Sequence, residues 1–242
     1  MRFSDSHLHL PLEGLTAWRE AGLLSGVVCA DPPEWEACLA TCAAAGKGIL
    51  PALGVHPWHL EKYPQEETLA QLERHLSECP LAALGEIGVD RMPGHPSPAC
   101  QMAWCKAQLA LASRWQRVAI LHVVRGWEFL WPCLDAFPQV RIVVHGFHGG
   151  RAEVSRLLAR PGAYVSLGFS LLRAGHRFLS VVRSLPRERL LVESDAPFGK
   201  HSPVELPSLI AHLASLRRED PETLACALAE NHRLLFGEGE IP

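Results

Sequence analysis

The stretch Phe3-Ser4-Asp5-Ser6-His7-Leu8-His9 places two imidazoles one residue apart at the end of a short predicted strand near the N-terminus. Side chains alternate along a β-strand, so His7 and His9 are expected to point to one side and to be able to bind one metal ion together. Two ligands do not complete a site, because a divalent cation held by nitrogen and oxygen takes about three to six. Later strands must therefore supply further imidazoles and carboxylates.

Short β-branched or apolar runs recur along the chain and alternate with longer segments of helical periodicity. The predicted strands span residues 2–7, 26–30, 49–54, 81–86, 118–122, 141–145, 163–167 and 190–194. The predicted helices span residues 34–45, 66–77, 98–115, 127–136, 151–160, 173–184, 203–216 and 221–235. This alternation predicts an α/β fold with a parallel sheet, of the closed (β/α)8 TIM-barrel type. An open doubly wound sheet is the alternative, but its usual Gly-x-Gly-x-x-Gly or Walker-type loop does not follow an early strand.

Length and composition favour a single domain over residues 1–242. The chain is 48% hydrophobic, enough for a sizeable core, and has no linker or internal repeat. Its eight cysteines are scattered through apolar helical segments, so we interpret them as reduced thiols of a cytoplasmic protein. No sequence signal indicates export, a membrane or an obligate protein partner. The net charge of −3 excludes a chain-wide attraction to nucleic acid, so any phosphate contact must be local.

Metal-binding side chains follow most of the predicted strands at their C-terminal ends, the face where active sites of (β/α)8 barrels lie. They are, in chain order, His7, His9, His56, Glu86, His122, His145 and Asp195. Without His56, the set holds four imidazoles and two carboxylates, which suit Zn²⁺, Mn²⁺ or Mg²⁺ and are enough for two ions that share a carboxylate. Two such ions can clamp the attacking and leaving oxygens of a phosphoester displacement. Asp195 is then the candidate base as well as a candidate ligand.

At these residues the chain resembles, segment by segment and in order, the TatD family of metal-dependent hydrolases and deoxyribonucleases. The matching segments are Asp5-Ser6-His7-Leu8-His9, Gly54-Val55-His56-Pro57, Gly85-Glu86-Ile87-Gly88-Val89-Asp90, Leu121-His122, His145-Gly146-Phe147 and Glu193-Ser194-Asp195-Ala196-Pro197. The resemblance implies a barrel in which His7, His9 and Asp195 hold one ion, Glu86 bridges two, and His122 and His145 complete the second. It also implies hydrolysis of phosphodiester bonds in DNA, typically at single-stranded ends, with Glu86 and Asp195 as catalytic carboxylates.

Two departures from the family's usual motifs concern the candidate substrate contacts. The fifth-strand motif commonly continues as His-x-Arg-Asp, whereas Arg125 stands one residue later here and no aspartate follows. After the sixth strand, His148 replaces a serine or threonine. We expect His56, Arg125 and His148 to bind substrate, because guanidinium and imidazole groups suit phosphate oxygens. Further loop candidates for the mouth are Arg91, Arg151, Arg173, Lys200 and His201, and candidates for stacking on a base are Trp58, Phe147, Phe169 and Phe198.

Two other functions stay open at this point. An amidohydrolase acting on a small cyclic amide or ester would commonly bridge its metals with a carboxylated lysine, and the fourth strand offers Glu86 with no lysine nearby. A metal-binding barrel without catalysis is the second alternative, and the presence of Asp195 beside a full ligand set argues against it. The remaining histidines are expected at the surface or at helix ends: His75, His176, His212 and His232.

Overall fold

The computed structural model describes residues 1–237, and its strands form one eight-stranded sheet whose order follows the chain. Every neighbouring pair is parallel. The strands are β1 (Phe3–His9), β2 (Leu23–Ala30), β3 (Ile49–Leu53), β4 (Ala83–Asp90), β5 (Ala119–Val124), β6 (Ile142–Val144), β7 (Ala163–Leu167) and β8 (Leu190–Val192). The prediction of a (β/α)8 barrel is confirmed. The single-domain prediction for residues 1–242 includes residues 238–242, which lie outside the described part, and stays a prediction.

The ring closes between β1 and the segment that follows β8. The Asp195 N–H donates to the carbonyl of His7 at 3.0 Å, and the His9 N–H donates to the carbonyl of Ala196 at 2.7 Å. Deeper in the barrel, the Ser6 hydroxyl donates to the carbonyl of Val192 at 3.0 Å. These bonds bring the last strand end beside the first, so that Asp195 joins His7 and His9 from nearly two hundred residues away.

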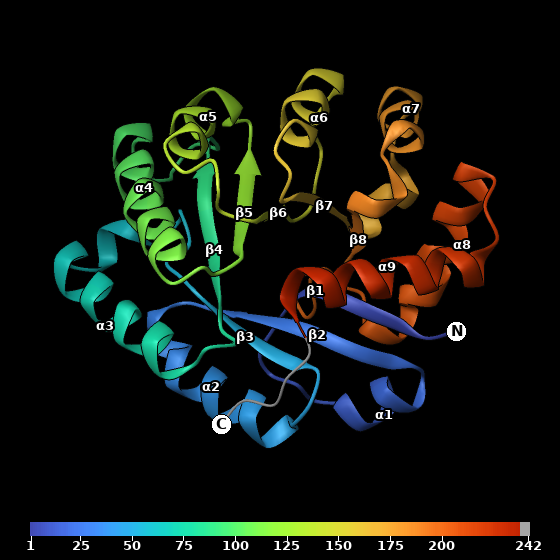
Figure 1. Ribbon diagram of the computed structural model, residues 1–242, viewed down its shortest axis with the longest axis horizontal. Helices are drawn as coiled ribbons and strands as arrows, with labels where there is room; N and C mark the ends of the chain where they lie inside the picture. The colour runs from blue at the N-terminus through green and yellow to red at the C-terminus, as the bar shows by residue number, and fades with distance from the viewer. Residues whose placement is uncertain (238–242) are drawn as a thin grey trace.

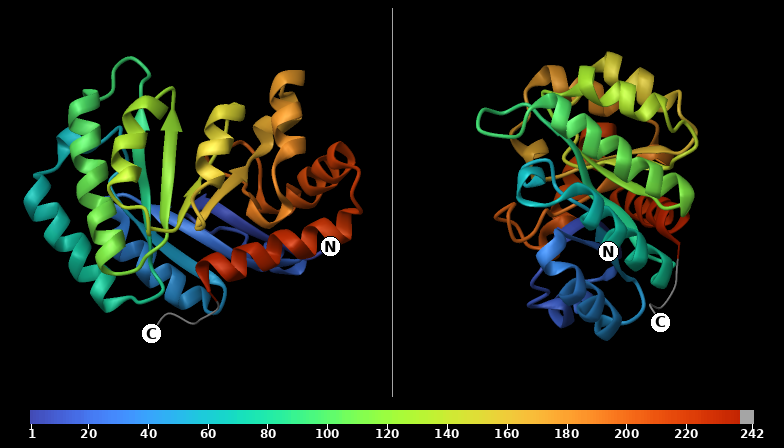
Figure 2. Two further views of the ribbon diagram at one scale, coloured as in Figure 1. Left: turned by 45° about the horizontal axis from the view of Figure 1, so that its top comes forward. Right: turned by 90° about the vertical axis from the view of Figure 1, so that its left-hand side faces the viewer.

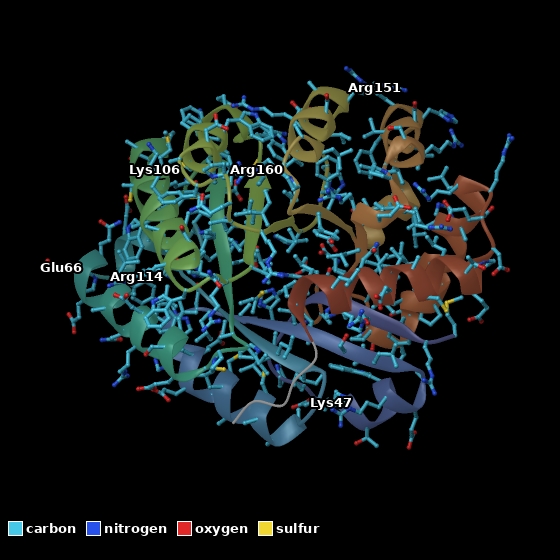
Figure 3. All side chains as sticks on the ribbon, in the orientation of Figure 1. Lys47, Glu66, Lys106, Arg114, Arg151 and Arg160 are labelled. Carbon is cyan, nitrogen blue, oxygen red and sulfur yellow. The ribbon has the colours of Figure 1, made fainter. Side chains whose placement is uncertain are left out.

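Helices occupy the outside of the strands, as Figure 1 shows, and the two further views in Figure 2 agree. They are α1 (Leu15–Glu20), α2 (Trp35–Ala45), α3 (Gln65–Glu78), α4 (Pro98–Arg114), α5 (Trp127–Asp135), α6 (Arg151–Leu158), α7 (His176–Ser184), α8 (Leu206–Arg217) and α9 (Pro221–Phe236). Short 3-10 turns are η1 (Pro32–Glu34), η2 (Leu60–Lys62), η3 (Phe169–Arg173), η4 (Arg187–Arg189) and η5 (Pro203–Glu205). Figure 3 shows charged residues on this outer layer, among them Glu66, Lys106 and Arg114.

Three helix predictions differ from the structure. The helix expected at 173–184 begins at His176, because Ala174 and Gly175 are extended. The helix expected at 203–216 starts with the η5 turn and becomes α-helical from Leu206. The six-residue α1 was not predicted, since a helix of that length shows little more than one period of hydrophobic repeat.

Alternation along the strands separates two apolar layers. Outward-facing residues such as Val28 and Leu121 pack with the helices in one large cluster. Inward-facing residues such as Val27, Leu50 and Ile120 fill the barrel in a second cluster. Side chains of a strand point alternately to its two faces, so the near-continuous apolar runs of the sequence follow directly from burial on both sides.

Helix α9 closes the end of the barrel away from the candidate metal ligands. Its N-terminus is capped by the Asp220 carboxylate, which accepts from the Thr223 N–H at 2.8 Å. Leu235 and Phe236, at the other end of α9, join the inner cluster. In Figure 1 the arrowheads of β4 and β5 point away from this helix. The opposite, C-terminal ends of the strands are therefore the end left for a site.

Burial of His232 on α9 and of His75 on α3 corrects two histidine predictions. His232 is buried and its Nδ1 lies 3.0 Å from the Ser25 hydroxyl inside the barrel. Burial lowers the pKa of His232 to about 4. His75 is also buried, with its ring edge-on to Trp35 at 5.7 Å between centroids. Both were expected at the surface or at helix ends, because helical spacing alone does not tell which face of a helix is buried.

The cysteines are all free thiols, as predicted. Cys226 is exposed and Cys100 half-buried, and the others are buried. In the part of the chain that the structure describes, the helices are too short or too polar to cross a lipid bilayer. The cytoplasmic location stays a prediction.

Candidate metal centre

Glu86 lies at the centre of the polar cluster, and two glycines of its strand let it do so. A Cβ at Gly85 would lie 2.7 Å from the Cβ of Ile120, closer than real side chains approach. Gly88 has a φ of 142°, and a Cβ there would lie 2.1 Å from the carbonyl oxygen of His122. Without these side chains β4 can press against β5, which brings the buried Glu86 carboxylate beside His122.

One oxygen of Glu86 faces the imidazoles of β1. Its Oε2 lies 3.2 Å from His7 Nε2 and 3.7 Å from His9 Nε2. The two Nε2 atoms are 3.0 Å apart, so both rings point to the same place. Asp195 Oδ1 completes this group at 3.6 Å from His7 Nε2 and 3.5 Å from His9 Nε2. We call His7, His9, Asp195 and this oxygen the β1 group.

The other oxygen of Glu86 faces three imidazoles from later strands. Its Oε1 lies 2.6 Å from His145 Nε2, 2.9 Å from His122 Nδ1 and 3.4 Å from His56 Nε2. His122 Nδ1 and His145 Nε2 are 3.1 Å apart. We call His56, His122, His145 and this oxygen the β5 group. The carboxylate of Glu86 thus stands between two sets of nitrogen donors, one on each of its oxygens.

The donor chemistry fits divalent cations. Three overlapping sets each bring three ligand atoms within 4.8 Å of one another: His7, His9 and Asp195; His7, Glu86 and His145; His56, Glu86 and His122. A neutral imidazole has a single N–H, so ring nitrogens that meet in pairs around one carboxylate cannot all be satisfied by donating. Nitrogen and carboxylate donors of this kind suit Zn²⁺ and Mn²⁺ best. The residues present therefore fit a metal centre.

Three further side chains contact the imidazoles at the ring nitrogen that faces away from Glu86. His122 Nε2 lies 3.1 Å from Asp90 Oδ2, His145 Nδ1 lies 3.5 Å from Glu193 Oε1, and His7 Nδ1 lies 3.3 Å from Cys29 Sγ. A partner on the far nitrogen fixes the tautomer and ring orientation of a metal-binding histidine. Sequence reasoning missed these roles. Asp90 and Glu193 stand within the quoted motifs, which could have drawn attention to them, whereas Cys29 carries no such signal.

The cluster keeps its carboxylates ionised. Burial alone would raise the pKa of Glu86, but the charges of His145 and His7 and the hydrogen bonds from its imidazole neighbours hold it well below its usual value. Burial likewise opposes ionisation of Asp195, and the hydrogen bond with His9 together with the charges of His7 and His145 lowers its pKa. Both groups are therefore carboxylates, able to bind a cation or accept a proton.

The surroundings of the imidazoles lower the pKa of some and raise the pKa of others. Burial lowers the pKa of His7 and of His56. For His122, burial acts in the same direction, but the hydrogen bonds with Asp90 and Glu86 outweigh it and raise the pKa. In His145 the nearby charge of Glu86 and the interaction with Glu193 raise the pKa well above the ordinary value. The carboxylates around His122 and His145 thus raise the pKa of both imidazoles against the effect of burial, and the same negative charge favours a bound cation.

Asp5 ties together the two strand ends that carry the β1 group. Its carboxylate accepts from the Ser194 hydroxyl at 2.6 Å, the Ser194 N–H at 3.0 Å and the His7 N–H at 3.2 Å. Burial raises the pKa of Asp5 to about 7 despite these hydrogen bonds. Asp195, which follows Ser194 in the chain, has a left-handed φ of 56°, a strained conformation that surrounding contacts must hold. The Asp5 contacts therefore fix the direction in which Asp195 points.

The predicted substrate residues are not all brought to this cluster. His56 lies in the cluster, with its Nε2 3.4 Å from Glu86 Oε1. Arg125 follows β5 directly, is exposed, and has a φ of 49° that turns the chain away from the strand. The ring of His148 instead stacks on Phe178 of α7 at 5.1 Å, and its Nδ1 lies 2.7 Å from the Gly146 carbonyl oxygen.

Several loop cations have local partners. Arg91 lies over the Phe129 ring and 3.8 Å from Glu128. Arg151 donates to Ser180 at 2.8 Å and lies at the outer end of α6 (Figure 3). Local contacts thus hold these two arginines beside α5 and α7.

Comparison with known proteins places the chain in one family. The family model described as TatD related DNase matches residues 4–237, nearly all of the chain. The chain belongs to the TatD family. Membership makes it a metal-dependent hydrolase of phosphodiester bonds, as the sequence predicted. A metal-dependent hydrolase of uncharacterised function from Escherichia coli, YjjV, is 31% identical over 97% of this chain and 98% of that protein. The 3'-5' ssDNA/RNA exonuclease TatD of Erwinia amylovora is 34% identical over 76% of each chain.

Solved structures of TatD relatives agree on the fold. The crystal structure of YjjV from Escherichia coli superposes with a TM-score of 0.86 at 30% identity, covering 97% of this chain and 98% of that one. A TatD-family hydrolase from Entamoeba histolytica gives 0.82 at 16% identity over 97% and 98% of the two chains, a likeness of fold alone. The TatD barrel is therefore matched over its full length.

Proposed function

We propose that this TatD-family protein is an exonuclease that removes nucleotides from the 3' ends of single-stranded DNA or RNA, with two divalent cations at the Glu86 cluster. The observation that carries the proposal is that each oxygen of Glu86 faces its own set of nitrogen donors. The names of the 3'-5' ssDNA/RNA exonucleases among the relatives support the substrate and the direction.

The cluster supplies ligands for both cations. In this proposal His7, His9 and Asp195 would hold one ion, His122 and His145 would hold the other, and Glu86 would offer one oxygen to each. Bound divalent cations at such a site neutralise charge on the phosphoryl group and make water more acidic. Asp90, Glu193 and Cys29 keep the imidazole rings turned toward their ions, each from the far ring nitrogen.

Asp195 is the proposed base. Its side chain is 39% exposed, whereas the Glu86 side chain is 7% exposed, so it is the cluster carboxylate that water reaches. Its Oδ1 faces His7 and His9, and in the proposal its Oδ2 accepts the proton from the attacking water. The lowered pKa keeps Asp195 ionised, so that its carboxylate is free of a proton before the reaction. General-base catalysis of this kind contributes roughly 10²- to 10⁴-fold.

Phosphate contacts are proposed for His56 and Arg125. His56 Nε2 is 3.4 Å from Glu86, at the edge of the β5 group, where it can donate to a phosphoryl oxygen. Arg125 is exposed at the same end of the barrel and offers a guanidinium fork that matches two phosphate oxygens. His148 is kept as a more distant substrate contact, because its ring is turned to α7.

The test is a cleavage assay with oligonucleotides labelled at the 5' or the 3' end, as single strands and as duplexes, with Mg²⁺, Mn²⁺ and Zn²⁺ in turn. We expect a ladder that shortens from the 3' end of single strands. Asp195→Asn should lower kcat by roughly 10²- to 10⁴-fold while most bound metal is retained. Cleavage of no phosphodiester with any of the three metals would overturn the proposal, and full activity of Asp195→Asn would remove Asp195 from the mechanism.

A further inference from the structure

Two aromatic rings are exposed at the strand ends. Among the aromatic side chains of residues 1–237, Trp58 and Phe198 are the exposed ones, at 47% and 71%. Phe147 and Phe169, the other candidates for base stacking, are buried within the fold. The structure therefore reduces the four candidates to two, one in the connection after β3 and one in the connection after β8.

Each exposed ring contacts an imidazole at a different end of the donor cluster. Phe198 lies edge-on to His9, in the β1 group, with ring centroids 4.8 Å apart. Trp58 lies edge-on to His56, in the β5 group, at 4.7 Å. A phosphate held by cations at the Glu86 cluster, between the two groups, would thus have one aromatic ring on either side.

Both rings are held in place by contacts that leave ring surface open. The Trp58 indole N–H donates to Asp90 Oδ2 at 2.6 Å. His95 stacks on one face of this indole, with centroids 5.0 Å apart and planes within 7°, and 47% of Trp58 stays exposed beside this contact. Phe198 sits in a turn closed by the Gly199 N–H, which donates to the Asp195 carbonyl at 2.7 Å. Preorganised rings lose little conformational entropy when a ligand binds.

We propose that Phe198 and Trp58 are two base-stacking positions, one for each of the bases that flank the scissile phosphate. This inference rests on the proposed nuclease function and adds the residues that select the substrate. Stacking on aromatic side chains is tolerant of base identity, because every base has a π-face. In a duplex those faces are covered by neighbouring base pairs, so rings placed this way favour single strands with unstacked ends.

The test pairs protein variants with abasic substrates. A single-stranded oligonucleotide carries a tetrahydrofuran residue in place of one base, either on the 5' or on the 3' side of the terminal phosphodiester. For the wild type, kcat/KM should fall by about 5- to 100-fold for each abasic substrate. Phe198→Leu should bring the ratio of natural to abasic rates close to one at one position, and Trp58→Leu should do so at the other. Leucine keeps apolar bulk but has no flat ring.

Aromatic replacements and a distant site separate stacking from structural damage. Trp58→Phe and Trp58→Leu both lose the hydrogen bond to Asp90, but only phenylalanine keeps a flat ring. If the ratio of natural to abasic rates is retained in Trp58→Phe and lost in Trp58→Leu, the ring acts by stacking. Phe198→Trp should likewise keep the ratio. Leu234→Ala, on an exposed part of α9, is the control and should leave every rate unchanged.

Three outcomes are decisive. Loss of discrimination at one position for each leucine variant supports the proposal. Leucine variants that slow natural and abasic substrates by the same factor, or a wild type that cleaves both equally, overturn it while the nuclease function stands. A wild type that cleaves no oligonucleotide overturns the proposed function itself, and the stacking positions with it.

Discussion

Replacing Asp90 by asparagine should weaken metal binding at the β5 group. The carboxylate is buried, and it accepts hydrogen bonds from Trp58 Nε1 at 2.6 Å, His122 Nε2 at 3.1 Å and the Met92 N–H at 2.8 Å. For His122 to bind a cation through Nδ1, its proton must lie on Nε2, where Asp90 holds it. Asparagine has the same shape but replaces one acceptor oxygen with an NH₂ group.

The size of the effect follows from these three donors. Whichever way the asparagine amide is turned, its NH₂ group faces at least one N–H, because one donor meets one carboxylate oxygen and two meet the other. A buried donor without a partner costs about 1 to 3 kcal/mol of stability. Loss of the charged partner behind a metal-binding histidine typically lowers metal affinity by about 10- to 100-fold.

The assay is competition between protein and a chromophoric zinc chelator, with urea denaturation to follow the free energy of unfolding. Asp135→Asn is the matched control, because Asp135 is an exposed aspartate that pairs with Arg156 at 2.6 Å. We expect Asp90→Asn to weaken one of two zinc-binding steps, and the control to weaken neither. A folded Asp90→Asn protein that binds zinc as tightly as the wild type would refute the reasoning.

Three further predictions concern Cys29, zinc binding at Glu86 and the protonation of His232. Cys29→Val should lower zinc affinity by about 10-fold or more, because valine offers His7 Nδ1 no hydrogen-bond partner. Cys29→Ser should lower it by less, because the serine hydroxyl can replace the thiol as that partner. Equal losses for the two variants in the chelator competition would contradict this. Zinc at 100 times its Kd should raise the free energy of unfolding by about 2.7 kcal/mol in urea denaturation, and Glu86→Ala should abolish most of the gain, whereas EDTA should remove it in the wild type. The pKa of His232 falls from 6.5 to about 4 in the folded protein, so the unfolded chain binds the proton more readily and the free energy of unfolding should fall as pH falls from 7 to 5. In His232→Gln this fall should be smaller by about 2 kcal/mol. Parallel pH profiles of the two proteins would count against the prediction.

The strand order and the face that carries the site could be predicted from the sequence. Apolar runs of four to eight residues alternate with helical periods, and parallel strands joined by helices leave few arrangements other than a barrel. The residues at the strand ends then had to meet, because all parallel strands end at one face. Local spacing was less informative for helices: the chain at Ala174 and Gly175 is extended, and α1 is too short to show a clear period.

The sequence by itself determined the candidate ligand types, since His7, His9, Glu86, His122, His145 and Asp195 follow from motifs at predicted strand ends. Tertiary structure alone decided which oxygen of Glu86 faces which nitrogens, because that depends on how closely β4 and β5 approach at their glycines. It also decided which partners lie behind the imidazoles and which aromatic rings are exposed. Those properties arise from contacts between residues far apart in the chain, and hydrophobic periodicity carries no information about them.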